Sequence, residues 1–390
     1  MSSDTKDIGL RGIPVADTNI CLIDGEKGEL YYRGYDIHDL AKNSSYEEVA
    51  YLLIYSELPT KTKLEGFKDE LKKERTIPSE VVEQMKLFPV NANPMDVLQS
   101  SISMLAAFDV DIDDDSEDAN QKKASKIVAK TATIVAYWDR IRNKENVVAP
   151  RKDLTHAENF LHMLKGEAPK KEFSKDLDIC LILHAEHSFN ASTFTARVVA
   201  STRAHIYASL SAACGSLSGP LHGGANTRVM RTLLNLGDPN NVEGWVVKQF
   251  DDDKRVMGMG HAIYHVMDPR AKILDPIGEK LGEELGEPKW HKMVKTIDEV
   301  TRREFKKRKG GDIFPNVDLY SAPVYYMLGI PPDLYTAVFA TSRVAGWSAH
   351  VLEEKYPQPP VKPMLYRPTS DYIGHYCGPT GCVYEPLNKR

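Results

Sequence analysis

The chain has 390 residues, of which 42% are hydrophobic and 27% charged, so it can bury a large core and we expect two lobes. Its formal net charge of −5 gives no general attraction to nucleic acid or to an anionic membrane, so an anionic ligand needs a local basic site. The first residues are polar, and no apolar run approaches the roughly 18 residues that cross a bilayer, so we expect a soluble protein without a secretory signal.

Strand signals are confined to the start of the chain. Two short apolar runs at residues 19–23 and 29–33 flank the turn sequence DGEKG at 24–28, which predicts a β-hairpin. Ser45 and Glu48 then have the spacing of a capping box, in which each side chain accepts a hydrogen bond from an otherwise unpaired backbone donor. A helix is therefore predicted through residues 49–54.

Helical patterns fill the rest of the chain. Asn93 and Pro94 are typical of a helix start, and the helix is predicted to continue through residue 108. The acidic stretch 109–118 lacks the glycine and the terminal glutamate of a calcium loop, which favours a solvated connection. Further helices are predicted at residues 124–143, 157–164, 193–216, 227–236, 298–309, 322–328 and 334–354. The fold class is thus predicted as all-α.

The five cysteines are scattered and odd in number, which favours a reducing, cytoplasmic location over a disulfide framework. They are Cys21, Cys180, Cys214, Cys377 and Cys382. The last two lie close together, but no second pair or histidines at matching spacing would complete a metal site. We interpret CGPTGC as a turn.

The segment GPLHGGAN at 219–226 carries a histidine, two glycines and then a helical pattern. We expect His222 at a helix N-terminus, where backbone donors and the positive end of the dipole disfavour an imidazolium. A neutral histidine there donates a hydrogen bond, as polarising a thioester carbonyl requires. The alternative is an exposed histidine in a tight turn.

The segment GMGH at 258–261 resembles the glycine-rich loops that wrap nucleotide phosphates, although this pattern alone is weak. Arg270 follows nine residues after His261 and offers a guanidinium suited to binding a carboxylate. Together they indicate an anionic substrate with a reactive carbonyl. Asp318, just after Pro315 and Asn316, is interpreted as a general base or as a helix cap.

Read together, these segments resemble the citrate synthases in their shorter prokaryotic form. The resemblance runs in order from about residue 9 to 373 and is carried by YYRGYDI, HAEHSFNASTFTARV, GPLHGGAN, VMGMGHAIYHVMDPRAKI, PNVDLYS, TSRVAGWSAH and RPTSDYIG.

The resemblance implies that acetyl-CoA, oxaloacetate and water are converted to citrate and CoA, a reaction of the tricarboxylic acid cycle. Asp318 would remove a proton from the acyl-CoA while His222 hydrogen-bonds to the thioester oxygen, and an enol results. His261 would donate to the keto oxygen of oxaloacetate. The resemblance implies no metal and no cofactor.

The resemblance also implies the binding residues. His187, Arg270 and Arg343 would bind oxaloacetate, and Arg367 would come from the partner subunit of a homodimer. The CoA-binding residues would be Val256, Met257, Gly258, Gly260, Lys307 and Lys309. Many relatives have basic residues where this chain has Ala262 and His265, so the way in which the CoA phosphates are held is open.

The implied fold is a citrate synthase fold with two interleaved domains. A large, dimer-forming helical domain would comprise residues 1–223 and 323–390, and a small helical domain at 224–322 would close over the substrates. Residues 187–194 also resemble the branch of 2-methylcitrate synthases, which use propionyl-CoA. One methylene is worth only about 1–3 kcal/mol, so use of both substrates stays open.

A metalloenzyme and a non-catalytic helical scaffold are the two alternative classes of function, and both fit the sequence less well. A metalloenzyme would need a ligand set such as His184, Glu186, His187, His222, His261 and Asp318, but HAEH does not have the HExxH spacing. A non-catalytic helical scaffold would have no reason to keep the two histidines and the aspartate together with the arginines.

Overall fold

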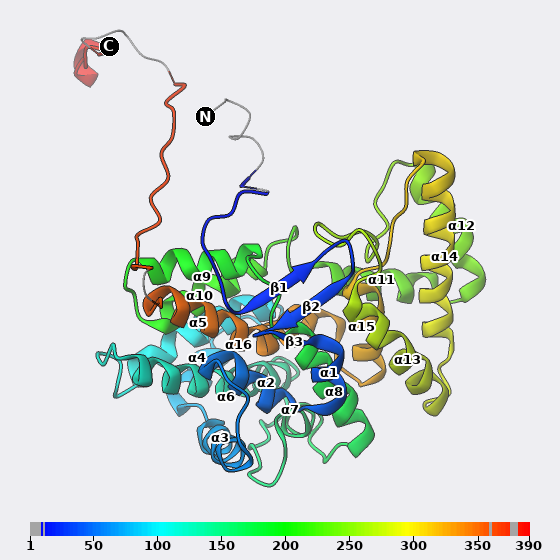
Figure 1. Ribbon diagram of the computed structural model, residues 1–390, viewed down its shortest axis with the longest axis horizontal. Coiled ribbons are helices and arrows are strands. Elements are labelled where there is room, and N and C mark those ends of the chain that lie inside the picture. Colours follow the sequence, from blue (N-terminus) through cyan, green and yellow to red (C-terminus); the bar gives the residue numbers. More distant parts are fainter. Residues whose placement is uncertain (1–8, 11, 359–360, 375–380) are drawn as a thin grey trace.

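The computed structural model describes residues 9–10, 12–358, 361–374 and 381–390 (Figure 1). Within these ranges the chain forms sixteen α-helices and one three-stranded antiparallel sheet, so the predicted all-α class is confirmed. None of the described helices is both long and apolar enough to cross a membrane.

The hairpin forms as predicted and gains a short third strand. Strands β1 (Cys21–Asp24) and β2 (Glu29–Tyr32) pair so that Cys21 faces Tyr32, and β3 (Tyr35–Asp36) pairs with β2. The turn leans on a distant loop, because the carbonyl of Gly25 accepts a hydrogen bond from the backbone N–H of His265 (2.9 Å). A Cβ at position 25 would lie 2.2 Å from the carbonyl oxygen of Ile263, so only glycine fits there.

Most helices follow one another closely, but a long connection, residues 252–268, separates two helices of the second half. In the first half they are α1 (Ile37–Asn43), α2 (Tyr46–Tyr55), α3 (Lys61–Glu74), α4 (Ser79–Lys86), α5 (Pro94–Leu105), α6 (Glu117–Arg142), α7 (His156–Lys165), α8 (Lys171–His184), α9 (Ala191–Ser201) and α10 (Ile206–Leu217). In the second half they are α11 (Ala225–Leu236), α12 (Val242–Asp251), α13 (Pro269–Glu284), α14 (Lys289–Lys309), α15 (Val317–Met327) and α16 (Tyr335–Lys355).

The helix starts predicted from capping residues are correct. Ser45 Oγ accepts from the N–H of Glu48 (3.3 Å), and Asn93 Oδ1 accepts from the N–H of Met95 (3.0 Å). The complete reciprocal capping box occurs instead at Thr155 and Glu158, where each side chain accepts from the other's backbone.

Several predicted elements need correction, among them the helix predicted at 298–309, which is the end of α14, a helix that begins at Lys289. Residues 193–216 form two helices, α9 and α10, because the chain breaks after Ser201 and Arg203 takes a left-handed φ of 69°. The helix predicted at 124–143 already begins at Glu117, capped by Ser116. The acidic stretch is only partly solvated, because buried Asp109 binds Lys126 Nζ (2.8 Å) and Tyr207 Oη (2.5 Å).

The cysteines are mostly as expected. Cys21, Cys180 and Cys214 are free thiols among the described residues. Cys382 is disulfide-bonded, so the argument against disulfides does not hold for it. Cys377, with which the predicted turn begins, lies outside the described residues.

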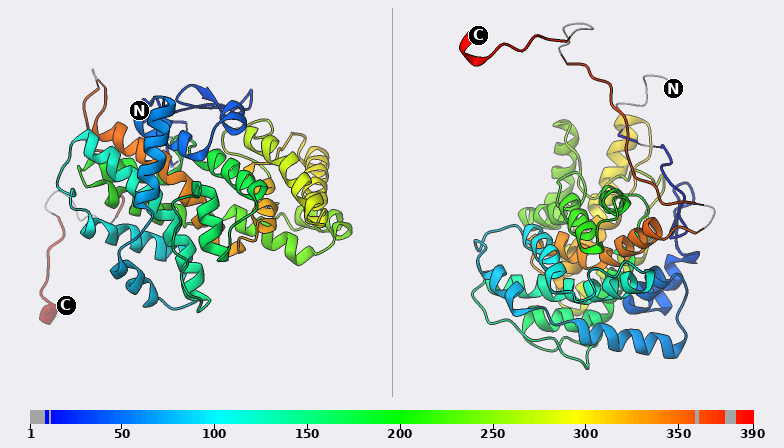
Figure 2. Two further views of the ribbon diagram at one scale, coloured as in Figure 1. Left: turned by 90° about the horizontal axis from the view of Figure 1, so that it is seen from below. Right: turned by 90° about the vertical axis from the view of Figure 1, so that its left-hand side faces the viewer.

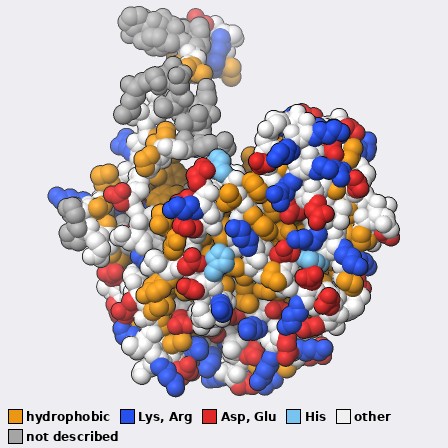
Figure 3. Space-filling view, turned by 45° about the vertical axis from the view of Figure 1, so that its right-hand side comes forward, with side chains coloured by type: hydrophobic (Ala, Val, Ile, Leu, Met, Phe, Trp, Pro, Cys, Tyr) orange, Lys and Arg blue, Asp and Glu red, His pale blue; other side chains and the backbone are white. Residues whose placement is uncertain are grey.

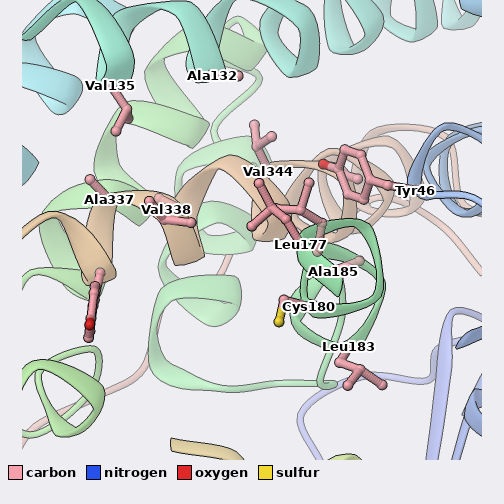
Figure 4. Packing of buried hydrophobic residues seen from close by; sticks show 14 of the residues in the cluster. Tyr46, Ala132, Val135, Leu177, Cys180, Leu183, Ala185, Ala337, Val338 and Val344 are labelled. Carbon is pink, nitrogen blue, oxygen red and sulfur yellow. The ribbon is translucent and has the colours of Figure 1, made fainter. Parts of the chain in front are cut away.

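Helix α16 runs through the middle of the molecule and is buried on nearly every side. It packs against α2, α5, α6, α8, α9 and α10, and it therefore buries polar residues such as Arg343 and His350 together with its apolar ones. Figure 4 shows Val338 and Val344 of α16 between α6, which carries Ala132 and Val135, and the residues of α8. This core fixes the backbone on which Arg343 is carried.

Helices α12 and α14 pack against each other and project from one end of the molecule, with α11, α13 and α15 at their base (Figures 1 and 2). Helix α13 also touches α1 and α8, and α11 touches α16. His222, His261 and Asp318 lie in or next to the segments from which α11, α13 and α15 begin.

Candidate active site

His222 lies in a tight turn at residues 219–224, just before α11. Its Nε2 accepts from the backbone N–H of Ser192 (3.2 Å) and lies 2.7 Å from Ser192 Oγ. Because Nε2 accepts, the proton of the neutral ring sits on Nδ1, which is left to donate to a ligand.

The helix N-terminus that faces His222 is not the predicted one. The donor comes from the first turn of α9, not from α11, because Ser192 is the second residue of that helix. The predicted neutral state is nevertheless obtained: burial lowers the pKa of His222 to about 4, and the nearby Arg343 guanidinium adds to the effect.

His261 has a defined tautomer. Its Nδ1 accepts from the backbone N–H groups of Ile263 (3.0 Å) and Tyr264 (3.1 Å), so the proton lies on Nε2. Burial lowers the pKa of His261 to about 4, and Arg270 lowers it further while Asp268 opposes the shift. The ring is thus a neutral hydrogen-bond donor at neutral pH.

Asp318 is the second residue of α15, and it is not the helix cap. Asn316 caps the helix by accepting from the N–H of Asp318 (3.0 Å), so the cap interpretation of Asp318 is wrong. Burial raises the pKa of Asp318 to about 6, although Arg270 works against the shift. Within the described residues the Asp318 carboxylate accepts no hydrogen bond, so it is available to contact a substrate.

The glycine-rich loop is joined to the start of α15. The carbonyl of Gly258 accepts from the N–H of Asn316 (2.9 Å), and the N–H of Gly260 donates to the carbonyl of Phe314 (2.7 Å). Gly258 has a φ of 84°, and a Cβ there would lie 2.8 Å from Cβ of Leu319. Only glycine permits this close approach, which brings the loop of His261 beside Asp318.

The turn of His222 is tied to the same helix. Buried Asn226, in the first turn of α11, donates from Nδ2 to Ser321 Oγ of α15 (2.6 Å). Ser321 lies three residues after Asp318, so one hydrogen bond connects the His222 and Asp318 segments.

His187 is buried beside His261, with 5.2 Å between their ring centroids. Its Nε2 lies 3.3 Å from the hydroxyl of Tyr264. Burial lowers the pKa of His187 well below its usual value, and the Arg270 guanidinium adds to that effect. His187 is therefore neutral as well.

Arg270 and Arg343 are both buried, but they are held differently. Arg270 pairs with Asp268 through Nε (3.0 Å) and Nη2 (2.7 Å), which outweighs the burial cost and raises its pKa. Arg343 donates from Nε to the carbonyl of His184 (2.6 Å) and lies over the Phe339 ring. Burial lowers the pKa of Arg343 to about 10, which marks a cation whose compensating anion is incomplete.

These two guanidiniums bring the predicted residues into one site. Arg343 acts electrostatically on His187, His222 and Asp318, and Arg270 acts on His187, His261 and Asp318. The space-filling view shows the molecule hollowed between the projecting lobe and the body (Figure 3). Two neutral imidazole donors and a carboxylate of raised pKa are thus gathered around the two guanidiniums.

The other predicted residues lie farther out. Lys307 and Lys309 are exposed at the end of α14, on the projecting lobe, where lysine and arginine side chains are frequent (Figure 3). Val256 is buried in the glycine-rich loop and Met257 is half-buried. Arg367 is exposed on the extended segment beyond α16.

Three residues of the site were not predicted. Ser192 holds His222, Asp268 holds Arg270, and Tyr264 contacts both His187 and His261. The sequence did carry a signal for Asp268, since a helix cap before a proline and an arginine two residues later belong to one local motif. Ser192 and Tyr264 carry no such local signal.

Two of the residues considered as metal ligands, His184 and Glu186, are held by other groups. His184 Nδ1 bonds to the carbonyl of Cys180 (2.7 Å), and Glu186 bonds to His350 (3.1 Å). Over the part of the chain that the structure describes, three or more histidine, cysteine, aspartate or glutamate side chains nowhere form a group that suits a metal ion.

Comparison with known proteins gives a consistent result. The family description "Citrate synthase, C-terminal domain" matches residues 9–369. A "Citrate synthase" of Haloferax volcanii is 43% identical, with all of both chains covered, and a "2-methylcitrate synthase" of Shewanella oneidensis is 37% identical, with 95% of this chain and 96% of the relative covered.

Solved structures agree. The chain resembles citrate synthase from Pyrobaculum aerophilum with a TM-score of 0.90 and 39% identity, over 98% of this chain and 95% of the other. It also resembles the citrate synthase of Thermoplasma acidophilum in a ternary complex with carboxymethyl coenzyme A and oxaloacetate, with a TM-score of 0.88, 31% identity and 98% of both chains covered.

Proposed function

The chain belongs to the citrate synthase family, and we propose that it condenses acetyl-CoA with oxaloacetate and water to citrate and CoA, and that His222, His261 and Asp318 carry out this chemistry. One observation supports the assignment above all. The neutral His222 lies near Arg343, the neutral His261 lies near Arg270, and Asp318, whose pKa is about 6, lies near both guanidiniums.

The first step forms the enol of the thioester. Asp318 takes a proton from the α-carbon of acetyl-CoA, and the electron pair of that C–H bond becomes the C=C bond. The π-electron pair of the thioester carbonyl moves to its oxygen, which takes up the Nδ1 proton of His222, so that the enol forms. The raised pKa of Asp318 makes it a stronger base than an ordinary carboxylate.

The second step forms the carbon–carbon bond. The enol carbon attacks the keto carbon of oxaloacetate, and the enol proton returns to His222 as the thioester carbonyl reforms. The keto oxygen takes up the Nε2 proton of His261 and becomes the hydroxyl of the citryl intermediate, and the proton held by Asp318 restores the balance as it is released. Water then hydrolyses the thioester of the citryl intermediate and releases CoA. The proposed steps use side chains of this chain only and need no cofactor.

Oxaloacetate is a dianion, so its binding requires cations that offset its loss of hydration. We assign His187, Arg270 and Arg343 to its carboxylates, with Arg367 supplied by the other subunit of a homodimer. The incomplete compensation of Arg343 supports this role, because a ligand carboxylate would complete it.

CoA binding is assigned to the glycine-rich loop and the end of α14. The backbone around Val256, Met257, Gly258 and Gly260 would contact the adenine, and Lys307 and Lys309 would approach the phosphates. The relative from Thermoplasma acidophilum carries a coenzyme A derivative in its structure. The loop connects directly to Asp318, so CoA and the base would be positioned together.

Domain closure is the final part of the proposal. Residues 224–322 would form a small domain that closes on the large domain, formed by residues 1–223 and 323–390, and would exclude water from the enol. The chain would act as a dimer. A cytoplasmic location and a role in the tricarboxylic acid cycle stay predictions from the sequence.

The acyl substrate is tested by an assay of free thiol. Oxaloacetate with acetyl-CoA should release CoA with a higher kcat/KM than oxaloacetate with propionyl-CoA. A difference of roughly 5- to 100-fold is expected for one methylene in an apolar pocket. Faster turnover of propionyl-CoA would make the chain a 2-methylcitrate synthase, and no thiol from either substrate would overturn the proposal.

A further inference from the structure

The extended segment at residues 361–374 leaves the body of the molecule after α16 (Figures 1 and 2). Of its fourteen residues all but one are exposed, and the exception is Tyr366. Arg367, which the proposed function assigns to the partner subunit's site, is the next residue. The position of Arg367 therefore depends on what holds Tyr366.

Tyr366 is held at three points. Its hydroxyl donates to Glu354 Oε2 (3.2 Å) near the end of α16, and its backbone N–H donates to Ser201 Oγ (3.3 Å) at the end of α9. Its ring packs edge-on against Phe194 of α9, with 5.4 Å between the ring centroids. The backbone and side chain of Tyr366 thus both contact the folded body.

Glu354, which accepts from the Tyr366 hydroxyl, is itself held by the buried Arg197. Arg197, in the middle of α9, pairs with Glu354 Oε2 through Nη2 (2.8 Å) and with Glu353 Oε2 through Nη1 (2.7 Å). Burial opposes the charge of Arg197, but Glu354 and Glu353 outweigh it and raise its pKa. Glu353 also accepts from the backbone N–H of Asn19 (2.8 Å).

The same arginine reaches toward the oxaloacetate residues. Arg197 Nη1 donates to Nδ1 of His350 (3.1 Å), and Nε2–H of His350 donates to Glu186 (3.1 Å). Glu186 precedes His187 in the sequence. A continuous set of buried polar contacts therefore joins the residues around one site to the segment that leaves for the other subunit.

We propose that Tyr366 is a positioning residue whose contacts with Glu354 and Phe194 fix the base of the C-terminal segment, so that Arg367 is presented to the oxaloacetate site of the partner subunit. The inference rests on the proposed function. We call residues 361–374 the arm. When Tyr366 is held in place, Arg367 loses little further conformational freedom on binding; without the contacts of Tyr366, the arm would lose much more.

Heterodimers with two different affinity tags test this directly. A subunit with Asp318→Asn has no active base but still supplies its own Arg367. When it is paired with an Arg367→Ala subunit, the one working site has both an intact Asp318 and an intact Arg367 only if Arg367 acts across the interface. About half of the wild-type kcat per dimer, with wild-type KM for oxaloacetate, is then expected.

The effect of Tyr366 is read from two matched heterodimers. In the first, Tyr366→Ala is placed on the Asp318→Asn subunit, which donates the arm to the working site. In the second, Tyr366→Ala is placed on the other subunit, which contains the working site. The first should have a KM for oxaloacetate raised roughly tenfold, as for loss of one hydrogen bond to a charged group, with little change in kcat.

The second heterodimer should keep the wild-type KM, because its working site receives an intact arm. Tyr366→Phe, which keeps the ring contact and loses the hydroxyl, should give a smaller rise than Tyr366→Ala. Tyr384→Ala, an exposed tyrosine farther along the chain, is the control and should change nothing.

Equal KM values in the two arrangements would overturn the role of Tyr366 while leaving the function intact. Lack of activity in the dimer of Asp318→Asn with Arg367→Ala would overturn the assignment of Arg367 to the partner subunit's site, and the inference with it. Thiol release by the wild-type homodimer tests the condensation itself independently.

Discussion

Asp318 has to be ionised to act as a base, and burial makes that ionisation costly. Its proton is bound more tightly in the folded chain, where the pKa is about 6, than in the unfolded chain, where it is near the usual 3.8. The carboxylate therefore destabilises the fold fully above pH 6, and this cost disappears as pH falls below about 4.

Asp318→Asn should nearly abolish condensation and leave oxaloacetate binding largely intact, because the amide cannot accept the α-proton. The same substitution should raise the free energy of unfolding by up to about 3 kcal/mol at pH 8, at roughly 1.4 kcal/mol per pKa unit. Thermal unfolding of both proteins from pH 8 to pH 4 measures this gain, which should shrink below pH 6. A variant with near wild-type turnover, or one no more stable at pH 8, would contradict the assignment.

Individual site residues were predictable where a local motif carried them. Asp318 and His261 stand in distinctive segments, and the neutral state of His222 followed from its glycine-rich turn. The reason for that neutrality was predicted wrongly, because the donor that faces His222 belongs to α9, thirty residues earlier. A sequence pattern does not show which distant helix end will face a given ring.

At the scale of single elements, the first turn of α9 holds the imidazole ring of His222, which we assign to catalysis. Ser192 contacts His222 through its hydroxyl, and that hydroxyl also accepts from Nε1 of Trp347 (3.1 Å) on α16. The helix therefore links the His222 ring to the central helix.

Ser192→Ala should lower kcat roughly 5- to 30-fold, since a hydrogen bond worth about 1–2 kcal/mol that orients the ring is lost. KM for oxaloacetate should change little, because His187, Arg270 and Arg343 remain. The hydroxyl of Thr195, on the same helix, donates to the carbonyl of Ala191. Thr195→Ala therefore serves as the control. Steady-state kinetics of both variants decides the matter, and equal kcat values would show that the hydroxyl is dispensable.

Helices were predictable where a cap and a regular apolar pattern coincided, as at Ser45 and Asn93. The break between α9 and α10 was missed because residues 202–205 contain no glycine or proline. Helix α15 was predicted to start at residue 322, whereas it starts at Val317 and carries Pro323 inside. A proline in a helix is unfavourable locally, so only the packing against α11 and α13 explains it.

At the scale of the whole molecule, the proposed domain closure should make the protein measurably more compact. In the proposed function, oxaloacetate binds His187, which precedes α9, Arg343 of α16, and Arg270 at the start of α13. Saturating oxaloacetate alone should therefore reduce the radius of gyration measured by X-ray scattering. Acetyl-CoA alone should leave it unchanged, as should oxaloacetate with Arg343→Leu. Compaction by acetyl-CoA alone would contradict this order.

The contact between the hairpin turn and the backbone of His265 joins parts separated by more than half of the chain. Such distant pairings form late, because a long stretch of polypeptide must be ordered first. As the protein is synthesised, the hairpin leaves the ribosome early and stays without this support until residue 265 has emerged. Asp318 and Arg367 follow later still. We therefore expect the growing chain to be inactive through most of its translation and to gain activity only near the end of synthesis.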